Sequence, residues 1–193
     1  MLNRVIFKCF FCICLCVIQR STWSYAQNSK LNFTSLTSKD GLSSNIVTAI
    51  LKDSHGLMWF ATEDGLNKYD GTSFTVYKHS DTDPHSLPAN DVISLHEDGS
   101  GNLWIGTNGG SAVIYDRKKD EFKSIQSFKG FHNPSNVVRA IYSDYLGKVW
   151  LANFSGLCVI DPETEKVTNF TVDRDRKDQL TTHNVICLFE DSK

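Results

Sequence analysis

Amide, carboxylate and aromatic side chains recur along this chain in a set that could recognise sugar hydroxyl groups. Amides and carboxylates hydrogen-bond hydroxyls, and an aromatic ring offers a flat apolar face. Their context is also that of ordinary turns, because Asn108-Gly-Gly110 and Glu63-Asp-Gly65 are common turn sequences. We therefore expect a binding rim in which most single residues only shape turns. The candidates are Asn45, Glu63, Asp64, Asn90, Asn108, Asn136, Asn153 and Phe154, with Arg139 a little deeper.

Metal and catalytic chemistry find little support in the sequence. Asp81-Thr-Asp83-Pro-His85 lacks the further oxygen ligands and the Gly of a calcium loop, which favours a solvated connection. The chain has no Gly-x-Ser-x-Gly, no P-loop and no Cys/His pair of catalytic spacing. A glycosidase needs paired carboxylates, which the sequence neither excludes nor suggests. We predict no catalytic residue, no metal and no cofactor.

An Asp-x-x-Gly-x-x-Trp motif returns about every 45 residues. Asp suits a turn because its carboxylate accepts local backbone N–H bonds, and Gly suits it because it tolerates positive φ. The Trp offers a large apolar face for packing on a neighbouring sheet. These residues are therefore predicted to be structural: Asp53, Gly56, Trp59; Asp98, Gly101, Trp104; Asp144, Gly147 and Trp150.

Each copy of the motif sits in a four-part unit. An apolar run precedes the turn, the Trp segment follows it, and a third segment opens at Gly65, Gly110 or Gly156. A short alternating segment, such as 74–77, closes the unit. The apolar runs are hydrophobic on both faces, as expected of strands buried on both sides.

Four short strands in a unit of this length predict an all-β protein, a β-propeller. Helical solenoids and immunoglobulin sandwiches fit less well, because no 3.6-residue period occurs and a sandwich does not repeat its own sequence. Residues 33–36 resemble a closing strand without a blade before it, and we interpret them as a latch strand. About three complete four-stranded blades and a partial fourth are expected, at residues 45–77, 90–125, 136–170 and 183–193.

Residues 1–26 differ from the rest of the chain. A positive start, an apolar run of ten residues and Ser24-Tyr-Ala26 predict a secretory signal peptide, with an uncleaved anchor as the alternative. The propeller then occupies residues 27–193. Outside residues 1–26, the cysteines are Cys158 and Cys187. Cys187 falls in a slot for small buried side chains, although a disulfide with Cys158 stays open. The net charge of −2, without a basic patch, argues against nucleic acid as a partner.

The repeat resembles the two-component regulator propeller family. Asn102-Leu-Trp-Ile-Gly-Thr107 and Trp59-Phe-Ala-Thr-Glu-Asp-Gly-Leu66 carry the likeness, and Leu36–Asn45 resembles the start of the periplasmic sensor region of hybrid two-component regulators. The family typically builds seven-bladed rings, which makes this chain an incomplete ring and a fragment of such a propeller. The histidine kinase, receiver and DNA-binding parts of such regulators would lie beyond Lys193.

The resemblance implies a periplasmic, non-enzymatic sensing module whose parent is an inner-membrane protein. Many members respond to oligosaccharides, which makes an oligosaccharide the expected ligand. The expected partners are the remaining blades and sensor domains, and a second copy in a full-length homodimer. Two alternatives stay open at this point: a secreted propeller scaffold for protein–protein interaction, and a propeller-based enzyme acting on glycans.

Overall fold

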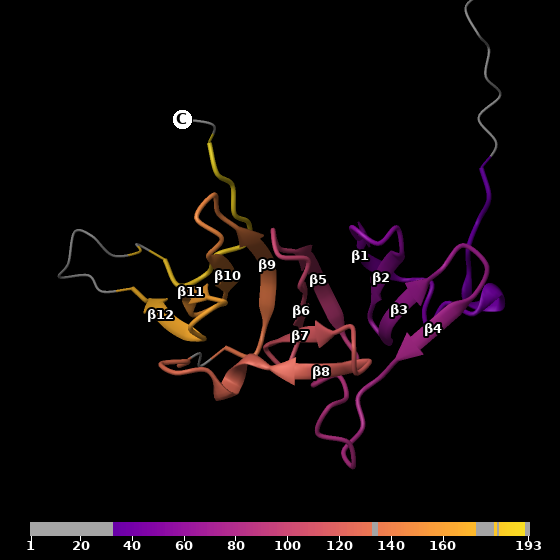
Figure 1. Cartoon of the computed structure of the whole chain (residues 1–193), viewed down its shortest axis with the longest axis horizontal. Coiled ribbons are helices and arrows are strands. Elements are labelled where there is room, and N and C mark those ends of the chain that lie inside the picture. Colours follow the sequence, from indigo (N-terminus) through magenta and orange to yellow (C-terminus); the bar gives the residue numbers. More distant parts are fainter. Residues whose placement is uncertain (1–32, 133–134, 173–179, 181, 192–193) are drawn as a thin grey trace, which may run out of the picture. The chain divides into compact units, whose positions relative to one another are not determined.

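The computed structural model describes residues 33–132, 135–172, 180 and 182–191. Its contacts divide the chain into Met1–Ser35 and Leu36–Lys193. The second unit contains three antiparallel sheets of four strands, each joined in chain order (Figure 1). Such a four-stranded meander is the blade of a β-propeller, which confirms the predicted fold class. The predicted signal peptide at 1–26 lies outside the described residues.

The strands follow the four-part unit closely, with limits that differ from the predicted ones by a residue or two. Blade 1 consists of β1 (Val47–Lys52), β2 (Met58–Thr62), β3 (Gly65–Tyr69) and β4 (Phe74–Tyr77). Blade 2 consists of β5 (Val92–Glu97), β6 (Leu103–Thr107), β7 (Ala112–Asp116) and β8 (Glu121–Ser124). Blade 3 consists of β9 (Val138–Ser143), β10 (Val149–Asn153), β11 (Gly156–Asp161) and β12 (Lys166–Phe170). Short 3-10 helices occupy Ser38–Asp40 and Ile125–Ser127.

The Asp-x-x-Gly turn forms as the sequence predicts. In blade 1 the Asp53 carboxylate accepts the backbone N–H groups of His55 and Leu57 at 3.0 and 2.9 Å. The Gly56 N–H donates to the Asp53 carbonyl at 2.9 Å, and Gly56 has φ +86°, where a side chain would be strained. The turn thereby joins the first two strands of the blade.

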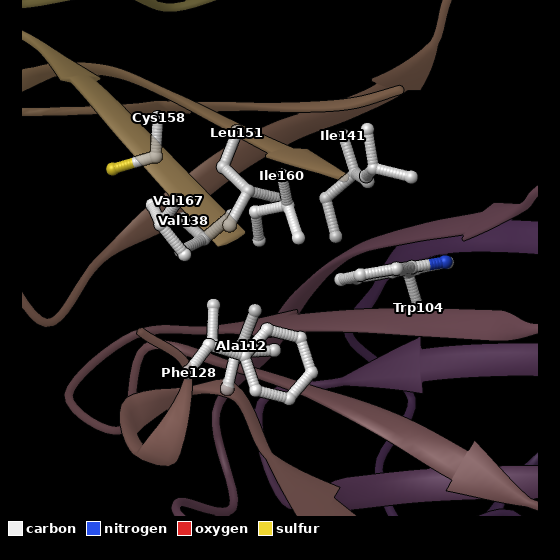
Figure 2. Packing of buried hydrophobic residues seen from close by; sticks show 11 residues of the cluster. Trp104, Ala112, Phe128, Val138, Ile141, Leu151, Cys158, Ile160 and Val167 are labelled. Carbon is white, nitrogen blue, oxygen red and sulfur yellow. The ribbon is translucent and has the colours of Figure 1, made fainter. Parts of the chain in front are cut away.

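The hydrophobic cores lie between the blades. One core joins blades 1 and 2 around Trp59, and the other joins blades 2 and 3 around Trp104; both indoles are fully buried. Figure 2 shows Leu151 and Ile160 of blade 3 facing Trp104 and Phe128 of blade 2. Each Trp therefore packs on the following blade. Trp150 of blade 3 is partly exposed and stacks on Phe170, with ring centroids 6.1 Å apart.

Three expectations were wrong: the burial of strand β1, the slot assigned to Gly110, and the burial of Cys187, which is described in the next paragraph. Strand β1 exposes Val47 and Ile50, because it contacts β2 and β5 and leaves its other face uncovered. Ser111, rather than Gly110, takes the slot of Gly65 and Gly156, since Thr107 and Thr62 donate their hydroxyls to the carbonyls of Ser111 and Gly65 alike. The middle copy has one residue more than the first between this glycine and the following Tyr-Asp pair, at Tyr69-Asp70 and Tyr115-Asp116, and this extra residue shifts the slot by one position.

Cys187 is exposed rather than packed in a core, because residues 182–191 form no strand. The disulfide is also absent: Cys158 and Cys187 are both free. Burial raises the pKa of the Cys158 thiol to about 11, so it stays protonated.

Residues 33–36 and 183–191 lie outside the strands of the structure. A latch strand and a first strand of a fourth blade both need a partner strand to pair with, and the described residues supply none for either. Residues 183–191 are nevertheless joined to blade 3 by a backbone hydrogen bond from the Val185 N–H to the Asn153 carbonyl at 3.1 Å. Both assignments stay predictions.

Candidate functional site

The predicted rim is formed by the segments that precede β1, β5 and β9 and by the loops at 63–64, 108–111 and 154–155. Most of its candidates are committed to local structure. The side-chain Oδ1 atom of Asn45 accepts a hydrogen bond from the Ser38 N–H at 2.8 Å, and Oδ1 of Asn90 accepts one from the His79 N–H at 2.7 Å. Asn108 donates to Asp91 at 2.7 Å. These amides shape turns, as the turn interpretation expects.

The rim also ties neighbouring blades together through backbone bonds. The Gly65 N–H donates to the Asn90 carbonyl at 2.7 Å, and the N–H groups of Gly109 and Ser111 both donate to the Asn136 carbonyl at 2.9 Å. Asn153 is buried, and its side chain accepts from the Ser155 N–H at 2.7 Å. These bonds therefore position the loops of the rim, while Asn136 itself is exposed.

Among the other candidates, Arg139, Phe154, Glu63 and Asp64 also lie at the surface. The Arg139 guanidinium lies 4.4 Å from the centre of the Phe154 ring, and Phe154 is 40% exposed. On blade 1, Lys78 pairs with Asp64 at 2.7 Å, and the Ser44 hydroxyl donates to Glu63 at 3.3 Å. The structure thus brings Arg139 and Phe154 together on blade 3, whereas Glu63 and Asp64 form a separate polar group on blade 1.

At the opposite edge of the sheets, each repeated Asp binds the Trp of its own motif. The indole Nε1–H groups of Trp59, Trp104 and Trp150 donate to Asp53, Asp98 and Asp144 at 2.7, 2.8 and 2.8 Å. Sequence reasoning gave the Asp to the turn and the Trp to packing, and it missed this bond. The constant spacing of the two residues was the signal that could have revealed it.

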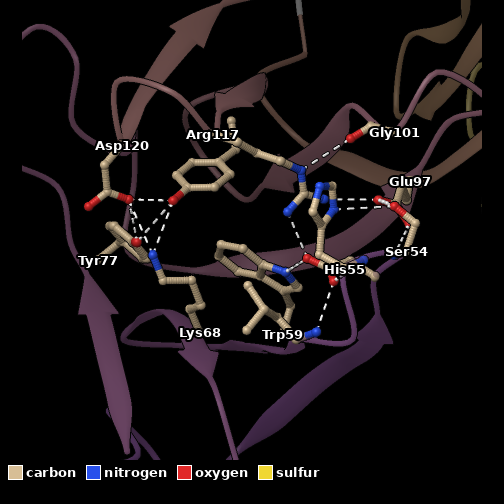
Figure 3. Close-up of polar contacts among 12 residues, drawn as sticks. Ser54, His55, Trp59, Lys68, Tyr77, Glu97, Gly101, Arg117 and Asp120 are labelled. Atoms are coloured by element: carbon tan, nitrogen blue, oxygen red, sulfur yellow. Dashed lines mark hydrogen bonds and ion pairs between the residues drawn. The ribbon is translucent and has the colours of Figure 1, made fainter.

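Blade 2 reaches back to blade 1 through Arg117, which the sequence analysis did not single out. Arg117 donates to Asp53 at 2.7 Å, to Glu97 at 2.9 Å and to the Gly101 carbonyl at 3.2 Å (Figure 3). Burial alone would raise the pKa of Asp53, but the hydrogen bonds from Trp59 and Arg117 outweigh it, and the pKa lies below its usual range. The ionised carboxylate therefore joins a turn, an indole and the next blade.

Lys68 forms a second connection between these blades. Its Nζ lies 5.8, 5.1 and 5.6 Å from the ring centres of Trp59, Tyr77 and Tyr115, and it pairs with Asp120 of blade 2 at 3.3 Å. The hydroxyl groups of Tyr115 and Tyr77 donate to the same carboxylate and hold the pKa of Asp120 below its usual range. Lys68 thus fills its own aromatic cage.

A cavity of about 740 Å³ opens at this same edge, around the turn of blade 2, and it also touches Ser54 and His55 in the turn of blade 1. Asp98 and Asn102 of blade 2 line it together with Pro162 and Glu165 of blade 3, and Ile114 and Phe128 form apolar walls. The candidate site predicted from the sequence lies at the other edge, and no sequence motif indicates this cavity.

The described part of the chain offers no constellation for catalysis by a metal. It contains no group of three or more His, Cys, Asp or Glu residues placed to hold an ion. The charged groups described above instead pair with one another and with turn N–H groups. None of the helices in the described residues is long and apolar enough to cross a membrane.

Comparison with known proteins agrees with the repeat and the blades. The repeat of the two-component regulator propeller family matches residues 41–64 and 86–109. These two segments are similar to the repeat of that family. The curated protein Histidine kinase P4 of Formosa agariphila is 45% identical over 62 residues, which are 32% of this chain and 4% of that protein.

Solved structures extend the likeness over most of the chain. The extracellular domain of a hybrid two-component system from B. thetaiotaomicron aligns with a TM-score of 0.69 and 27% identity, covering 80% of this chain and 22% of that chain. A second extracellular domain from that organism, of a one-component system, has a TM-score of 0.68 over 86% of this chain and 22% of that chain. At 23% identity the second likeness shows the fold alone. The chain therefore resembles extracellular propeller domains of two-component sensors and spans about a fifth of their length.

Proposed function

We propose that this chain is a ligand-sensing propeller segment of a two-component sensor, located in the periplasm, with an oligosaccharide as its ligand. The observation that carries the proposal is the 27% identity, over 80% of the chain, to the extracellular domain of a hybrid two-component system. A sensor segment in this position contributes binding surface, while a kinase elsewhere in the parent protein would supply the output. The segment itself is proposed to be non-enzymatic.

The arrangement of Arg139 and Phe154 supports an oligosaccharide as the ligand. Sugars bind proteins through an apolar ring face and through hydroxyl groups that accept and donate hydrogen bonds. Phe154 exposes part of its ring at the rim, and Arg139 beside it keeps N–H donors at the surface. The inter-blade bonds of Asn90 and Asn136 hold the surrounding loops, so the platform is preorganised.

Calorimetry with a panel of neutral and acidic oligosaccharides tests this function. We expect saturable binding, and we expect Phe154→Ala to weaken it about tenfold, equivalent to about 1.4 kcal/mol. Tyr145→Ala is the matched control, because Tyr145 is an exposed aromatic residue at the opposite edge. No binding by any sugar of the panel, or equal losses in the two variants, would refute the oligosaccharide proposal.

A protein scaffold is the second candidate function. Tyr145 and Leu146 stand side by side on the turn between β9 and β10 and are 84% and 65% exposed. Adjacent exposed apolar side chains of this size often mark a protein contact. Cross-linking of the parent protein through a photoreactive residue at position 145 tests this function. A specific adduct with a partner protein would favour it, and its absence would count against it.

A further inference from the structure

Pro162 stands in blade 3 where Arg117 stands in blade 2. Asp116 pairs with Glu121 across β7 and β8, and Asp161 pairs with Lys166 across β11 and β12 in the same register. The turns that follow also match. The Asp116 carboxylate accepts the N–H groups of residues 118 and 119, and Asp161 accepts those of residues 163 and 164. The backbones are equivalent, but blade 3 has Pro162 at this position and therefore no guanidinium that could bind a carboxylate of blade 2.

Asp98 consequently differs from Asp53 in its partners. Both carboxylates bind an indole and two turn N–H groups, but Asp53 also accepts the cationic Arg117. The further partner of Asp98 is the neutral Asn102 side chain, at 2.9 Å. Asp98 forms no ion pair with any described residue, although it is only 7% exposed. A nearly buried carboxylate without a counter-cation leaves electrostatic attraction unused.

A cavity of about 740 Å³ opens beside Asp98. It is bounded by Asp98 and Pro162, which take the places of Asp53 and Arg117. Of the three Lys and Arg residues in its wall, Arg117 binds Asp53 and Glu97, Lys123 pairs with Glu165, and Lys118 is exposed to solvent. Its volume is in the range that small-molecule sites occupy.

We propose that this cavity binds a small molecule with a guanidinium or primary ammonium group, and that Asp98 is its anionic anchor. Arg117 donates to Oδ2 of Asp53, and on Asp98 the neutral Asn102 amide holds the same oxygen, so a guanidinium ligand would replace that amide. Ile114 and Phe128 supply apolar walls for a short aliphatic chain. The site lies at the edge opposite the rim, so it is separate from the oligosaccharide site and does not depend on it.

The indole resonances of the chain provide a direct probe. Trp104 donates its Nε1–H to Asp98, so a cation at Asp98 should shift this resonance in a 1H–15N spectrum. Titration with agmatine is expected to shift Trp104 saturably, with a dissociation constant of about 1 mM for so small a ligand. The Trp59 resonance is the internal control, because Arg117 already occupies its carboxylate, and Trp104→Phe identifies the peak.

Pro162→Arg tests the proposal from inside the protein, with Pro162→Gln as the matched control. The arginine should occupy the cavity, abolish the agmatine shift and raise Tm by about 2–8 °C relative to Pro162→Gln. Pro162→Gln should keep the agmatine shift, since it removes the proline without adding a charge. Equal shifts of Trp59 and Trp104, a persistent shift in Pro162→Arg, or a larger shift with glucuronate than with agmatine would overturn the proposal.

Discussion

Replacing Asp53 by Asn isolates the contribution of Arg117 to the contact between blades 1 and 2. The substitution keeps the size of the side chain but turns one carboxylate oxygen into an NH2 group that faces the donors of Trp59 and Arg117. Breaking a buried charge pair by removing one partner costs about 3–5 kcal/mol. Asp98→Asn is the matched control, because Asp98 has the same turn and indole bonds without an arginine.

The control likewise turns an NH2 group toward the Trp104 donor and loses charge assistance, but it breaks no ion pair, so its cost should be about 1–3 kcal/mol. The expected difference of about 2 kcal/mol between the two variants corresponds to about 4–8 °C in Tm for a domain of this size. Urea unfolding of the 193-residue chain, followed by circular dichroism, measures the free energy of unfolding of both variants, and thermal unfolding measures their Tm. A double-mutant cycle of Asp53→Asn with Arg117→Met should give a coupling of about 2 kcal/mol.

The pH dependence follows from the same contact. The pKa of Asp53 is lower in the folded state than in the unfolded one, so the stabilisation is complete above about pH 4 and is lost as the pH falls through the folded pKa. Asp53→Asn should remove this acid-sensitive part. Equal losses of stability in Asp53→Asn and Asp98→Asn, or a coupling near zero, would refute the reasoning that Arg117 fastens the blades.

Three further predictions concern single positions. Burial lowers the pKa of His96, whose Nε2 atom lies 2.8 Å from the Ser143 hydroxyl, so the free energy of unfolding should fall as the pH drops below about 6.5. In His96→Gln, the urea midpoint should depend less on pH, and an unchanged pH dependence would contradict this. Gly106→Ala should lower the free energy of unfolding by about 1–3 kcal/mol, because its Cβ would lie 2.1 Å from the Ser94 hydroxyl. Adding Ser94→Ala should restore part of this stability in thermal unfolding, and additive losses in the two variants would contradict the prediction. Ser111→Gly should stabilise the chain by about 1 kcal/mol, since Ser111 has φ +68° and a buried hydroxyl without a hydrogen-bond partner. Ser111→Ala removes the hydroxyl but keeps the backbone strain, so equal urea midpoints for the two variants would count against this.

The repeat made the strands and the blade order predictable, because Asp, Gly and Trp each have a local reason for their place in the turn. Burial was less predictable, since it depends on which strand has a neighbour. Val47 and Cys187 are exposed because their segments lack a covering sheet. In the slot of Val47, Val92 and Val138 of the other two blades are buried. Local patterns do not carry that information.

The candidate binding site at the rim stays a prediction. The side chains of Asn90 and Asn153 bind backbone N–H groups, Asn108 binds the Asp91 carboxylate, and Arg139 lies with Phe154 at the surface. Arg117 and Lys68 escaped prediction because their partners lie on another blade. A charge that pairs across 50 or more residues leaves no periodic signal, whereas the absence of Arg at Pro162 becomes visible once the blades are superposed.

The central claim, that this chain binds an oligosaccharide without transforming it, can be tested in one measurement. The 193-residue chain is incubated with each oligosaccharide that calorimetry identifies as a ligand, and the sugar is recovered and analysed by mass spectrometry. The account predicts saturable binding and a ligand recovered with its mass unchanged. Shorter products that accumulate with time, or the absence of any binding sugar, would contradict it.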